Sequence, residues 1–136
     1  KLAHFVRQRQ ENWLFLRQAL NDCSDVLILP EAAPASRPSW FGFLITLRED
    51  APFDRNSLVR HLEARNIQTR NLFAGNLLRH PCFDELRDLG SGYRVVGSLE
   101  NTDRIMRDTF WVGVYPGMTR DMLEYMAETI KEAARD

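Results

Sequence analysis

The chain has 136 residues, of which 44% are hydrophobic and 27% are charged, a balance typical of one globular domain rather than of a disordered or fibrous protein. Its 18 Lys and Arg residues nearly cancel its 19 Asp and Glu residues, which excludes a general electrostatic attraction to nucleic acid or to an anionic membrane. Since no apolar run of about 18 residues could span a bilayer and the first residues lack the apolar core of a signal peptide, we expect a cytoplasmic protein.

The first half of the chain indicates one helix and one clear strand. In residues 2–20 the apolar positions recur mostly at steps of three and four, which is typical of a helix with one apolar face. A short apolar run over residues 26–29 ends at Pro30, and a connection rich in Pro and Ala follows at residues 31–39. Residues 40–47 combine aromatic and β-branched side chains at strand length, so they form the strongest strand prediction.

The second half indicates further helices and strands. A helix is predicted over residues 54–65, because the carboxylate of Asp54 can accept hydrogen bonds from the exposed amides of a first turn. Three elements follow in chain order: a strand over residues 67–72, a helix from residue 101 or 102 to residue 107, and a second clear strand over residues 109–116. Thr119 can then cap a final helix. The apolar face of that helix consists of Met122, Leu123, Met126, Ile130 and Ala134.

The irregular alternation of these elements predicts an α/β fold, namely a two-layer α+β sandwich. A small sheet of three or four mostly antiparallel strands would be covered by helices on one side. We expect Phe41 and Phe43 to belong to the core, and we leave Trp40 open between core and ligand contact. Gly113 is expected to allow close packing in its strand, and the Pro-Gly pair at residues 116–117 to supply the turn that ends it.

Neither the histidines nor the cysteines form a recognisable motif. His4, His61 and His80 lack the spacing that a metal site needs, and Cys23 and Cys82 match neither a zinc nor an iron-sulfur pattern. We interpret both cysteines as reduced structural thiols. Because no nucleophile with a base and an orienting acid is recognisable, autonomous hydrolase chemistry is not expected.

The stretch TRNLFAGNLLRHPCF, residues 69–83, is too apolar for a solvated loop and too polar for a core. Its amide, guanidinium and imidazole groups suit hydroxyls, carbonyls and phosphate oxygens, which makes it a candidate for ligand binding. A polar loop packed on its own domain explains the same composition equally well.

Three separated stretches carry a resemblance to a known family. NIQTRNLFAGNLLRHPCFD, with RPSWFGFLITL upstream and NTDRIMRDTFWVGVYPGMT downstream, resembles the C-terminal part of the DegT-like sugar-nucleotide aminotransferases, which are fold type I pyridoxal-phosphate (PLP) enzymes. More narrowly, the chain resembles the 3-dehydrases that act on CDP-4-keto-6-deoxyglucose in deoxysugar biosynthesis for lipopolysaccharide O antigen. The resemblance covers practically the whole chain, with the stretches in the family's order.

The resemblance implies that residues 1–136 are a single C-terminal small domain, and that an N-terminal large domain outside this chain binds PLP. It also implies a homodimer and, for the dehydrase branch, an upstream iron-sulfur cluster and a reductase partner. PLP chemistry needs a lysine amine or a base that replaces it. Lys1 and Lys131 are the only lysines, and neither is expected to anchor PLP. We therefore expect no bound cofactor, no metal and no independent catalysis in this chain.

The resemblance also implies that residues 69–80 form a lip over a sugar-nucleotide cleft. The arginine would pair with a phosphate or sugar oxygen, the asparagines would bond hydroxyls, and the phenylalanine would supply an apolar wall. The glycine would let the backbone approach the substrate, and the histidine would bond the substrate or orient the loop. The expected substrate-binding residues are Arg70, Asn71, Phe73, Gly75, Asn76 and His80.

Two alternatives stay open at this stage. The chain can be the small domain of a sugar-nucleotide aminotransferase, since the lysine or histidine that separates the two branches lies upstream. It can also be a non-catalytic interaction module that docks through the apolar face of its first helix, because the apolar surface exposed by a missing domain looks the same.

Overall fold

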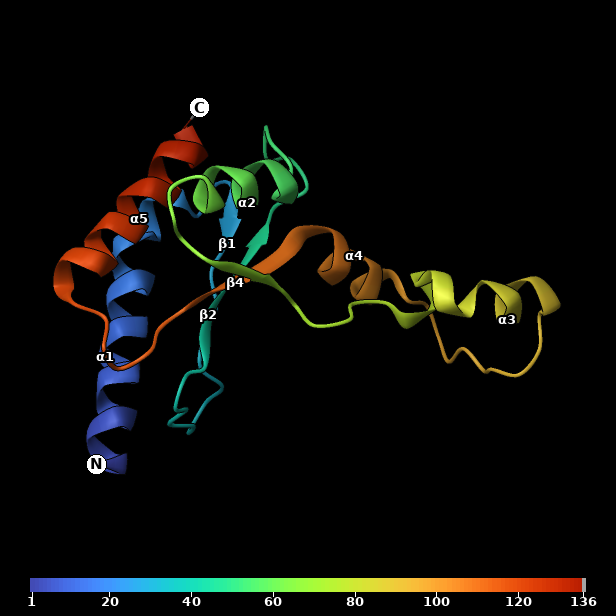
Figure 1. Ribbon diagram of the computed structural model, residues 1–136, viewed down its shortest axis with the longest axis horizontal. Helices are drawn as coiled ribbons and strands as arrows, with labels where there is room; N and C mark the ends of the chain where they lie inside the picture. Colours follow the sequence, from blue (N-terminus) through green and yellow to red (C-terminus); the bar gives the residue numbers. More distant parts are fainter. Residues whose placement is uncertain (136) are drawn as a thin grey trace.

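One antiparallel sheet of four strands organises the computed structural model, which describes residues 1–135 (Figure 1). The strands are β1 (Leu27–Ile28), β2 (Gly42–Leu47), β3 (Thr69–Asn71) and β4 (Thr109–Gly113). The α-helices are α1 (Leu2–Ala19), α2 (Arg55–Glu63), α3 (Asp84–Leu89), α4 (Glu100–Asp108) and α5 (Arg120–Arg135). The strand order β1-β2-β4-β3 puts β2 and β4 at the centre of the sheet. Within residues 1–135, no helix has both the length and the apolar character to cross a membrane.

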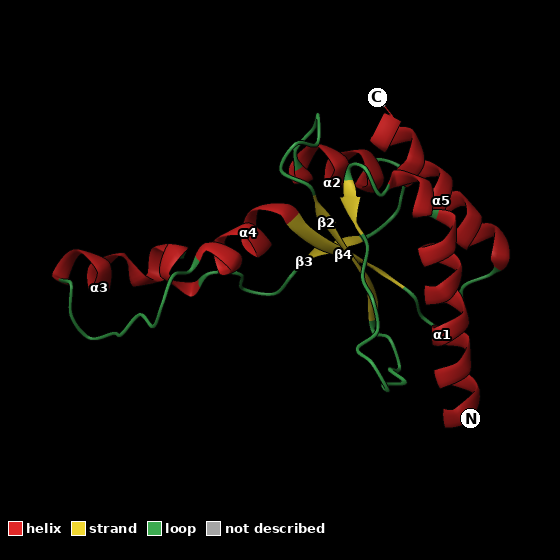
Figure 2. Ribbon diagram, turned by 180° about the vertical axis from the view of Figure 1, so that it is seen from behind, coloured by secondary structure: helices red, strands yellow, loops and turns green. Residues whose placement is uncertain are grey.

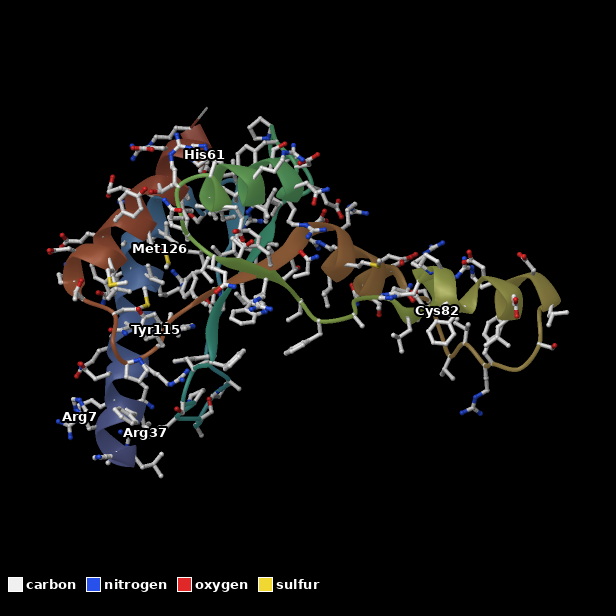
Figure 3. All side chains as sticks on the ribbon, in the orientation of Figure 1. Arg7, Arg37, His61, Cys82, Tyr115 and Met126 are labelled. Atoms are coloured by element: carbon white, nitrogen blue, oxygen red, sulfur yellow. The ribbon has the colours of Figure 1, made fainter. Side chains whose placement is uncertain are left out.

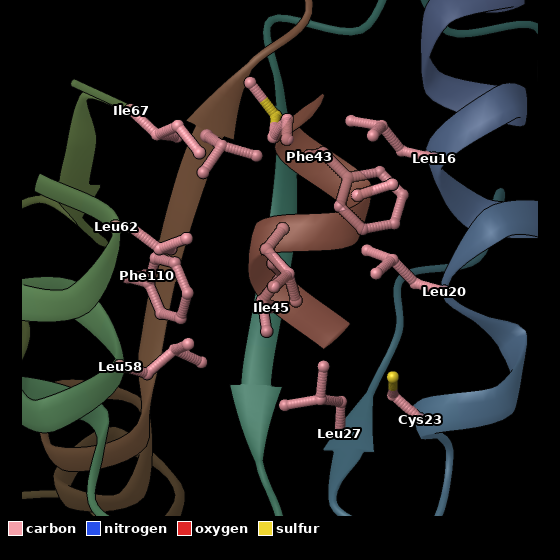
Figure 4. Packing of buried hydrophobic residues seen from close by; sticks show 14 of the residues in the cluster. Leu16, Leu20, Cys23, Leu27, Phe43, Ile45, Leu58, Leu62, Ile67 and Phe110 are labelled. Atoms are coloured by element: carbon pink, nitrogen blue, oxygen red, sulfur yellow. The ribbon is translucent and has the colours of Figure 1, made fainter. Parts of the chain in front are cut away.

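The core lies between one face of the sheet and helices α1, α2 and α5 (Figure 2). Along β2 every second residue is buried, namely Phe43, Ile45 and Leu47, as the two-residue period of a strand requires. Phe110 and Val112 of β4 face the same side, because they lie opposite Ile45 and Phe43. The helices contribute Leu16 and Leu20 of α1, Leu58 and Leu62 of α2, and Leu123, Ala127 and Ile130 of α5 (Figure 4). The predicted α/β fold with helices on one side is thus confirmed.

Two helices start at the capping residues that the sequence predicts. At the start of α2, Asp54 Oδ1 accepts a hydrogen bond from the Ser57 amide at 2.6 Å. At the start of α5, Thr119 Oγ1 accepts one from the Met122 amide at 3.3 Å. Each bond satisfies an amide that the first helical turn leaves without a partner. The bond from Ser57 is also the main cause that lowers the pKa of Asp54 below its ordinary value.

The strand predicted over residues 67–72 is shorter than expected. The Ile67 amide donates to the Leu62 carbonyl at 3.0 Å, as part of the turn that ends α2, so this amide is not available to a neighbouring strand. β3 therefore covers only Thr69–Asn71 and pairs with residues 110–112 of β4. Because this pairing ends at Thr69 and Val112, the edge of β4 beyond Val112 has no neighbouring strand in the described chain.

The expectation that Phe41 belongs to the core is wrong. Phe41 precedes β2 and is 65% exposed, and its ring packs on Trp111 at a centroid distance of 4.9 Å, on the face that the helices do not cover. Phe43, in contrast, is buried as predicted. Trp40 is half-buried because it stacks on Trp13 of α1, with ring centroids 4.3 Å apart.

The close packing expected at Gly113 occurs at Gly42 instead. A methyl group on Gly42 would lie 2.5 Å from Trp111 Cε3, so only glycine fits beneath this indole ring. A methyl group on Gly113 would meet no atom within 4 Å. Gly113 therefore leaves open space on the same uncovered face of the sheet.

Residues 72–108 form an arm that leaves the sheet after β3 and returns along α4 into β4 (Figures 1 and 2). The arm also carries two short 3-10 helices, Leu77–Arg79 and Pro81–Phe83, and α3. In both views α3 lies at the far end of the arm, away from α1, α2 and α5. The helix predicted in the returning limb is confirmed as α4, whereas the sequence does not indicate that the segment projects from the sheet.

Candidate functional site

A groove with a volume of about 1010 Å³ lies at the edge of the sheet beside β4. It forms because β3 pairs with β4 only as far as Val112, so that, among the residues the structure describes, no strand flanks β4 on this side beyond that position. Its walls come from residues 65–68, β3, β4 and its continuation to Tyr115, and the first half of α5. We call this the edge groove.

The wall of the edge groove that α5 and the turn before it form is apolar and adaptable. Three of the chain's four methionines line it: Met118, Met122 and Met126. Unbranched thioether side chains adjust to irregular shapes, so this wall can fit a ligand without a rigid match. The Tyr125 hydroxyl donates to the Arg65 carbonyl at 3.1 Å, which ties α5 to the turn after α2. Figure 3 labels Tyr115 and Met126, which lie on the side of the molecule that carries α1 and α5.

The charged groups of the edge groove are cationic. Among residues 1–135, those that line it include Arg65 and Arg70 but no Asp or Glu. Arg70 lies directly opposite Trp111 in the sheet, so both side chains belong to the uncovered face. The carboxylate of Glu63 lies outside the lining and accepts hydrogen bonds from the amide and hydroxyl of Thr69. These bonds are the main cause that lowers the pKa of Glu63, and the charge of Arg70 contributes less. An anion entering the groove would therefore meet guanidinium groups beside aromatic rings.

Three of the six predicted substrate-binding residues line the edge groove: Arg70, Asn71 and Phe73. Phe73 is 81% exposed and has a positive φ of 48°, so its ring stands at the surface where an apolar wall was expected. Asn71 Oδ1 accepts a hydrogen bond from Arg55 Nη1, which restricts the orientation of its side-chain amide. Arg55 also donates to the carbonyls of Met106 and Arg107 at 3.2 Å, so one guanidinium joins the end of β3 to the returning limb of the arm.

Gly75 and His80 lie instead at the base of the arm. Gly75 has a φ of 60°, and a methyl group there would lie 2.7 Å from Met106 Cγ, so both the backbone conformation and the packing against α4 require glycine. Nε2 of His80 donates to the Ala74 carbonyl at 2.5 Å. Both residues therefore hold the turn that starts the arm, and neither lines the edge groove.

Asn76 lies inside the domain and not at a surface cleft, which corrects its expected position. Its side chain is only 3% exposed, because Nδ2 donates to Asp103 Oδ1 at 2.7 Å and Oδ1 accepts from the Leu78 amide at 3.1 Å. Asp103 also accepts two hydrogen bonds from Arg79, at 3.1 and 2.9 Å. These contacts join the outgoing limb of the arm to α4.

Acidification should open the base of the arm through Asp103. Hydrogen bonds from Arg79 and then Asn76 lower the pKa of Asp103 from 3.8 to about 2, so the folded protein binds this proton less readily than the unfolded chain. The stabilisation is therefore complete above pH 3.8 and is lost as the pH falls through about 2. We expect the side-chain amide signals of Asn76 to shift over this window in an NMR titration. Asp103→Asn should abolish the transition, and Asp88→Asn in α3 should leave it; an unchanged transition in Asp103→Asn would contradict this assignment.

Sequence reasoning missed the aromatic part of the edge groove. Trp111 and Tyr115 lie in the run of residues 109–116, whose composition is typical of a buried strand, and Phe41 was expected in the core. The alternation of the strand places Trp111 and Tyr115 on the face opposite Phe110 and Val112. That alternation is visible in the sequence, whereas the absence of helices on the second face is not.

The described residues do not fit PLP as a covalently held cofactor. Lys131 Nζ lies 3.7 Å from Asp22 Oδ2 and 3.2 Å from Glu128 Oε1, and neither it nor Lys1 lines the edge groove. Within residues 1–135 there is also no group of three or more His, Cys, Asp or Glu side chains placed to hold a metal ion. The arrangement of guanidinium, amide and aromatic groups can bind and orient a ligand.

Comparison with known proteins gives consistent matches over almost the whole chain. Residues 1–131 match the DegT/DnrJ/EryC1/StrS aminotransferase family. The chain is 48% identical over 132 residues to lipopolysaccharide biosynthesis protein RfbH of Salmonella typhimurium, covering 97% of this chain and 29% of that protein. It is also 48% identical over 132 residues to dTDP-4-dehydro-2,6-dideoxy-D-glucose 3-dehydratase of Saccharopolyspora spinosa, covering 97% and 27%. The chain thus spans less than a third of these relatives.

The fold has a counterpart in a solved structure. The chain matches a GDP-4-keto-6-deoxymannose-3-dehydratase that contains a trapped PLP-glutamate geminal diamine, with a TM-score of 0.80 and 25% identity. The match covers 96% of this chain and 32% of that protein. PLP is thus bound in a structure of the complete homologous enzyme.

Proposed function

The chain belongs to the DegT/DnrJ/EryC1/StrS aminotransferase family, and from this we propose that residues 1–136 are the substrate-positioning small domain of a PLP-dependent sugar-nucleotide 3-dehydratase. The observation that carries the proposal is the 48% identity over 132 residues to a 3-dehydratase of a dTDP-linked deoxysugar. The equal identity to RfbH supports a place in lipopolysaccharide biosynthesis.

In this proposal, PLP is held by a large domain that lies outside the 136 residues. The absence of a lysine from the lining of the edge groove, within the described part of the chain, supports this division of tasks. The resemblance to the dehydrase branch further suggests an iron-sulfur cluster in the large domain, a homodimer, a reductase partner and a cytoplasmic enzyme.

The contribution of this chain would be to bind and orient the sugar nucleotide at the edge groove. Arg70 would pair with a phosphate oxygen, since a guanidinium matches phosphate in charge and geometry. Asn71, held by Arg55, would bond a sugar hydroxyl, and Phe73 would form an apolar wall. Fixing a substrate in this way lowers the entropic part of the reaction barrier. Gly75, Asn76 and His80 would act indirectly, by holding the base of the arm.

The second candidate is a sugar-nucleotide aminotransferase, which the name of the matched family favours. The two reactions differ in what happens to the sugar: a 3-dehydratase removes the 3-hydroxyl, whereas an aminotransferase transfers an amino group from a donor to the keto carbon. The full-length protein should therefore be incubated with a 4-keto-6-deoxy sugar nucleotide, in one sample with PLP and glutamate and in another with pyridoxamine phosphate and a chemical reductant, because replacing the 3-hydroxyl by hydrogen consumes two electrons. Loss of the 3-hydroxyl supports the proposal, whereas a stable amino sugar formed with glutamate refutes it in favour of the alternative.

Within the full-length protein, Arg70→Ala is expected to raise KM for the sugar nucleotide about tenfold to hundredfold, because a charge-assisted hydrogen bond to phosphate is lost. Steady-state kinetics with the sugar nucleotide as the varied substrate measures this effect. The matched control is Arg94→Ala, which removes the same charge from an exposed site on the arm and should leave KM unchanged. Equal effects of the two substitutions would remove Arg70 from the substrate site.

A further inference from the structure

Gly113 leaves a gap between two aromatic residues on the uncovered face of the sheet. Trp111, Gly113 and Tyr115 follow one another at steps of two, so they share that face, each roughly 7 Å from the next along the chain. A methyl group on Gly113 would contact no atom within 4 Å. The floor of the edge groove at this point is therefore bare backbone with an aromatic side chain on either side.

Neither aromatic side chain fills the space directly above Gly113. The indole of Trp111 lies over Gly42, where a methyl group would come within 2.5 Å of Cε3, and Phe41 packs against it at a centroid distance of 4.9 Å. The ring of Tyr115 lies over Gly117, where a methyl group would come within 3.0 Å of Cε2. Since a methyl group on Gly113 would meet neither ring within 4 Å, the space above Gly113 is accessible.

The groups around this gap suit an aromatic anion. Arg70 is the direct cross-strand neighbour of Trp111, and strands in a sheet lie roughly 5 Å apart. Asn66 and Gln68, from the turn before β3, line the same groove and offer amide donors and acceptors to the edge of a ring. With no carboxylate among the lining residues that the structure describes, nothing in the lining repels a phosphate.

We propose that the space above Gly113 is a slot for the base of a nucleoside diphosphate, with the diphosphate bound by Arg70. The proposal deepens the proposed function and rests on it for the class of ligand. The base lies on the backbone of Gly113 between Trp111 and Tyr115, where stacking on aromatic side chains stabilises any base. Asn66 and Gln68 reach its polar edge, and Met118 and Met122 form an apolar rim that adapts to its size.

Gly113→Val in the full-length protein tests the slot directly. Valine fits an extended strand position and favours it over glycine, so the melting temperature should stay equal or rise, while the side chain fills the slot. Binding of dTDP and of CDP, measured by calorimetry, should weaken about tenfold. Inorganic pyrophosphate, which has no base, should bind with unchanged affinity. Ala32→Val, at an exposed loop position, is the matched control and should affect neither ligand.

Further variants separate the slot from the phosphate site. Gly113→Ala adds only a methyl group and should weaken nucleotide binding less than Gly113→Val does. Arg70→Ala should weaken nucleotide and pyrophosphate binding alike. Unchanged nucleotide affinity in a folded Gly113→Val protein overturns the slot, and so does an equal loss of nucleotide and pyrophosphate binding in that variant. A structure of the full-length protein with its own chain seated over Gly113 overturns it as well.

The experiments distinguish failure of the slot proposal from failure of the proposed 3-dehydratase function. If the full-length protein catalyses 3-dehydration and Gly113→Val changes neither KM nor nucleotide affinity, the slot is wrong and the function stands. If the protein catalyses neither 3-dehydration nor amino transfer, but Gly113→Val selectively loses nucleotide affinity, the slot stands and the function is wrong.

Discussion

Phe110→Ala is expected to lower the free energy of unfolding by about 3–5 kcal/mol, the usual cost of deleting a buried phenyl ring. The Phe110 side chain is fully buried on the central strand β4, opposite Ile45 of β2. Figure 4 shows its ring beside Leu58 and Leu62 of α2. Because a domain of this size is stable by only about 5–15 kcal/mol, the substitution should leave a marginally folded protein. Urea unfolding followed by far-UV circular dichroism measures the loss.

Phe73 provides the matched control for Phe110. It is the same residue type, but its side chain is 81% exposed and contributes little buried area. Phe73→Ala should therefore change the free energy of unfolding by no more than about 0.5 kcal/mol. If the two substitutions destabilise the protein equally, Phe73 is buried in the folded state and cannot serve as a surface wall of the edge groove.

Asn76→Ala is expected to loosen the base of the arm and leave the sheet intact. The substitution removes the 2.7 Å hydrogen bond to Asp103 and the 3.1 Å hydrogen bond from the Leu78 amide, at a cost of about 1–3 kcal/mol for buried polar groups left without partners. Hydrogen exchange measured by mass spectrometry should become faster in residues 72–108. Exchange in β2 and β4 should stay slow, because their core contacts are unchanged.

Asn101→Ala serves as the control for this local effect. Asn101 is exposed on α4, so its replacement should leave exchange in the arm unchanged. If Asn76→Ala leaves exchange unchanged as well, Asn76 does not hold the arm. A loss of substrate binding without faster exchange would instead favour direct contact of Asn76 with the substrate, as the resemblance implies.

The position of the arm bears on the edge groove through Arg55. Its guanidinium donates to Asn71 in β3 and to the carbonyls of Met106 and Arg107 in the returning limb of the arm. The orientation of Asn71 therefore depends on where the arm lies. Loosening the arm at Asn76 can alter the groove although Asn76 does not line it.

Features that depend on neighbouring residues could be read from the sequence. The strand character of β2, the helical steps of α1 and α5, and the caps at Asp54 and Thr119 arise within a few residues of chain, because a strand propensity, a cap or an amphipathic face is determined by neighbouring residues. The fold class follows from the order of these elements. The composition of residues 69–83 also singled out a candidate segment, of which Arg70, Asn71 and Phe73 line the edge groove.

Only the tertiary structure decided which face of the sheet stays uncovered and which polar residues are used internally. Phe41 and Trp111 resemble core residues by composition, yet no helix packs over them in the described chain, because α1, α2 and α5 all lie on the other face. Asn76 is of a residue type that often binds ligands, yet its side-chain amide donates a hydrogen bond to Asp103, 27 positions away. Such contacts join residues distant in sequence, and local periodicity carries no information about them. The space above Gly113 exists for the same reason: a glycine in a strand is ordinary, and the open slot appears only because β3 begins at Thr69, opposite Val112, so that no strand of the described chain lies beside Gly113 on that side.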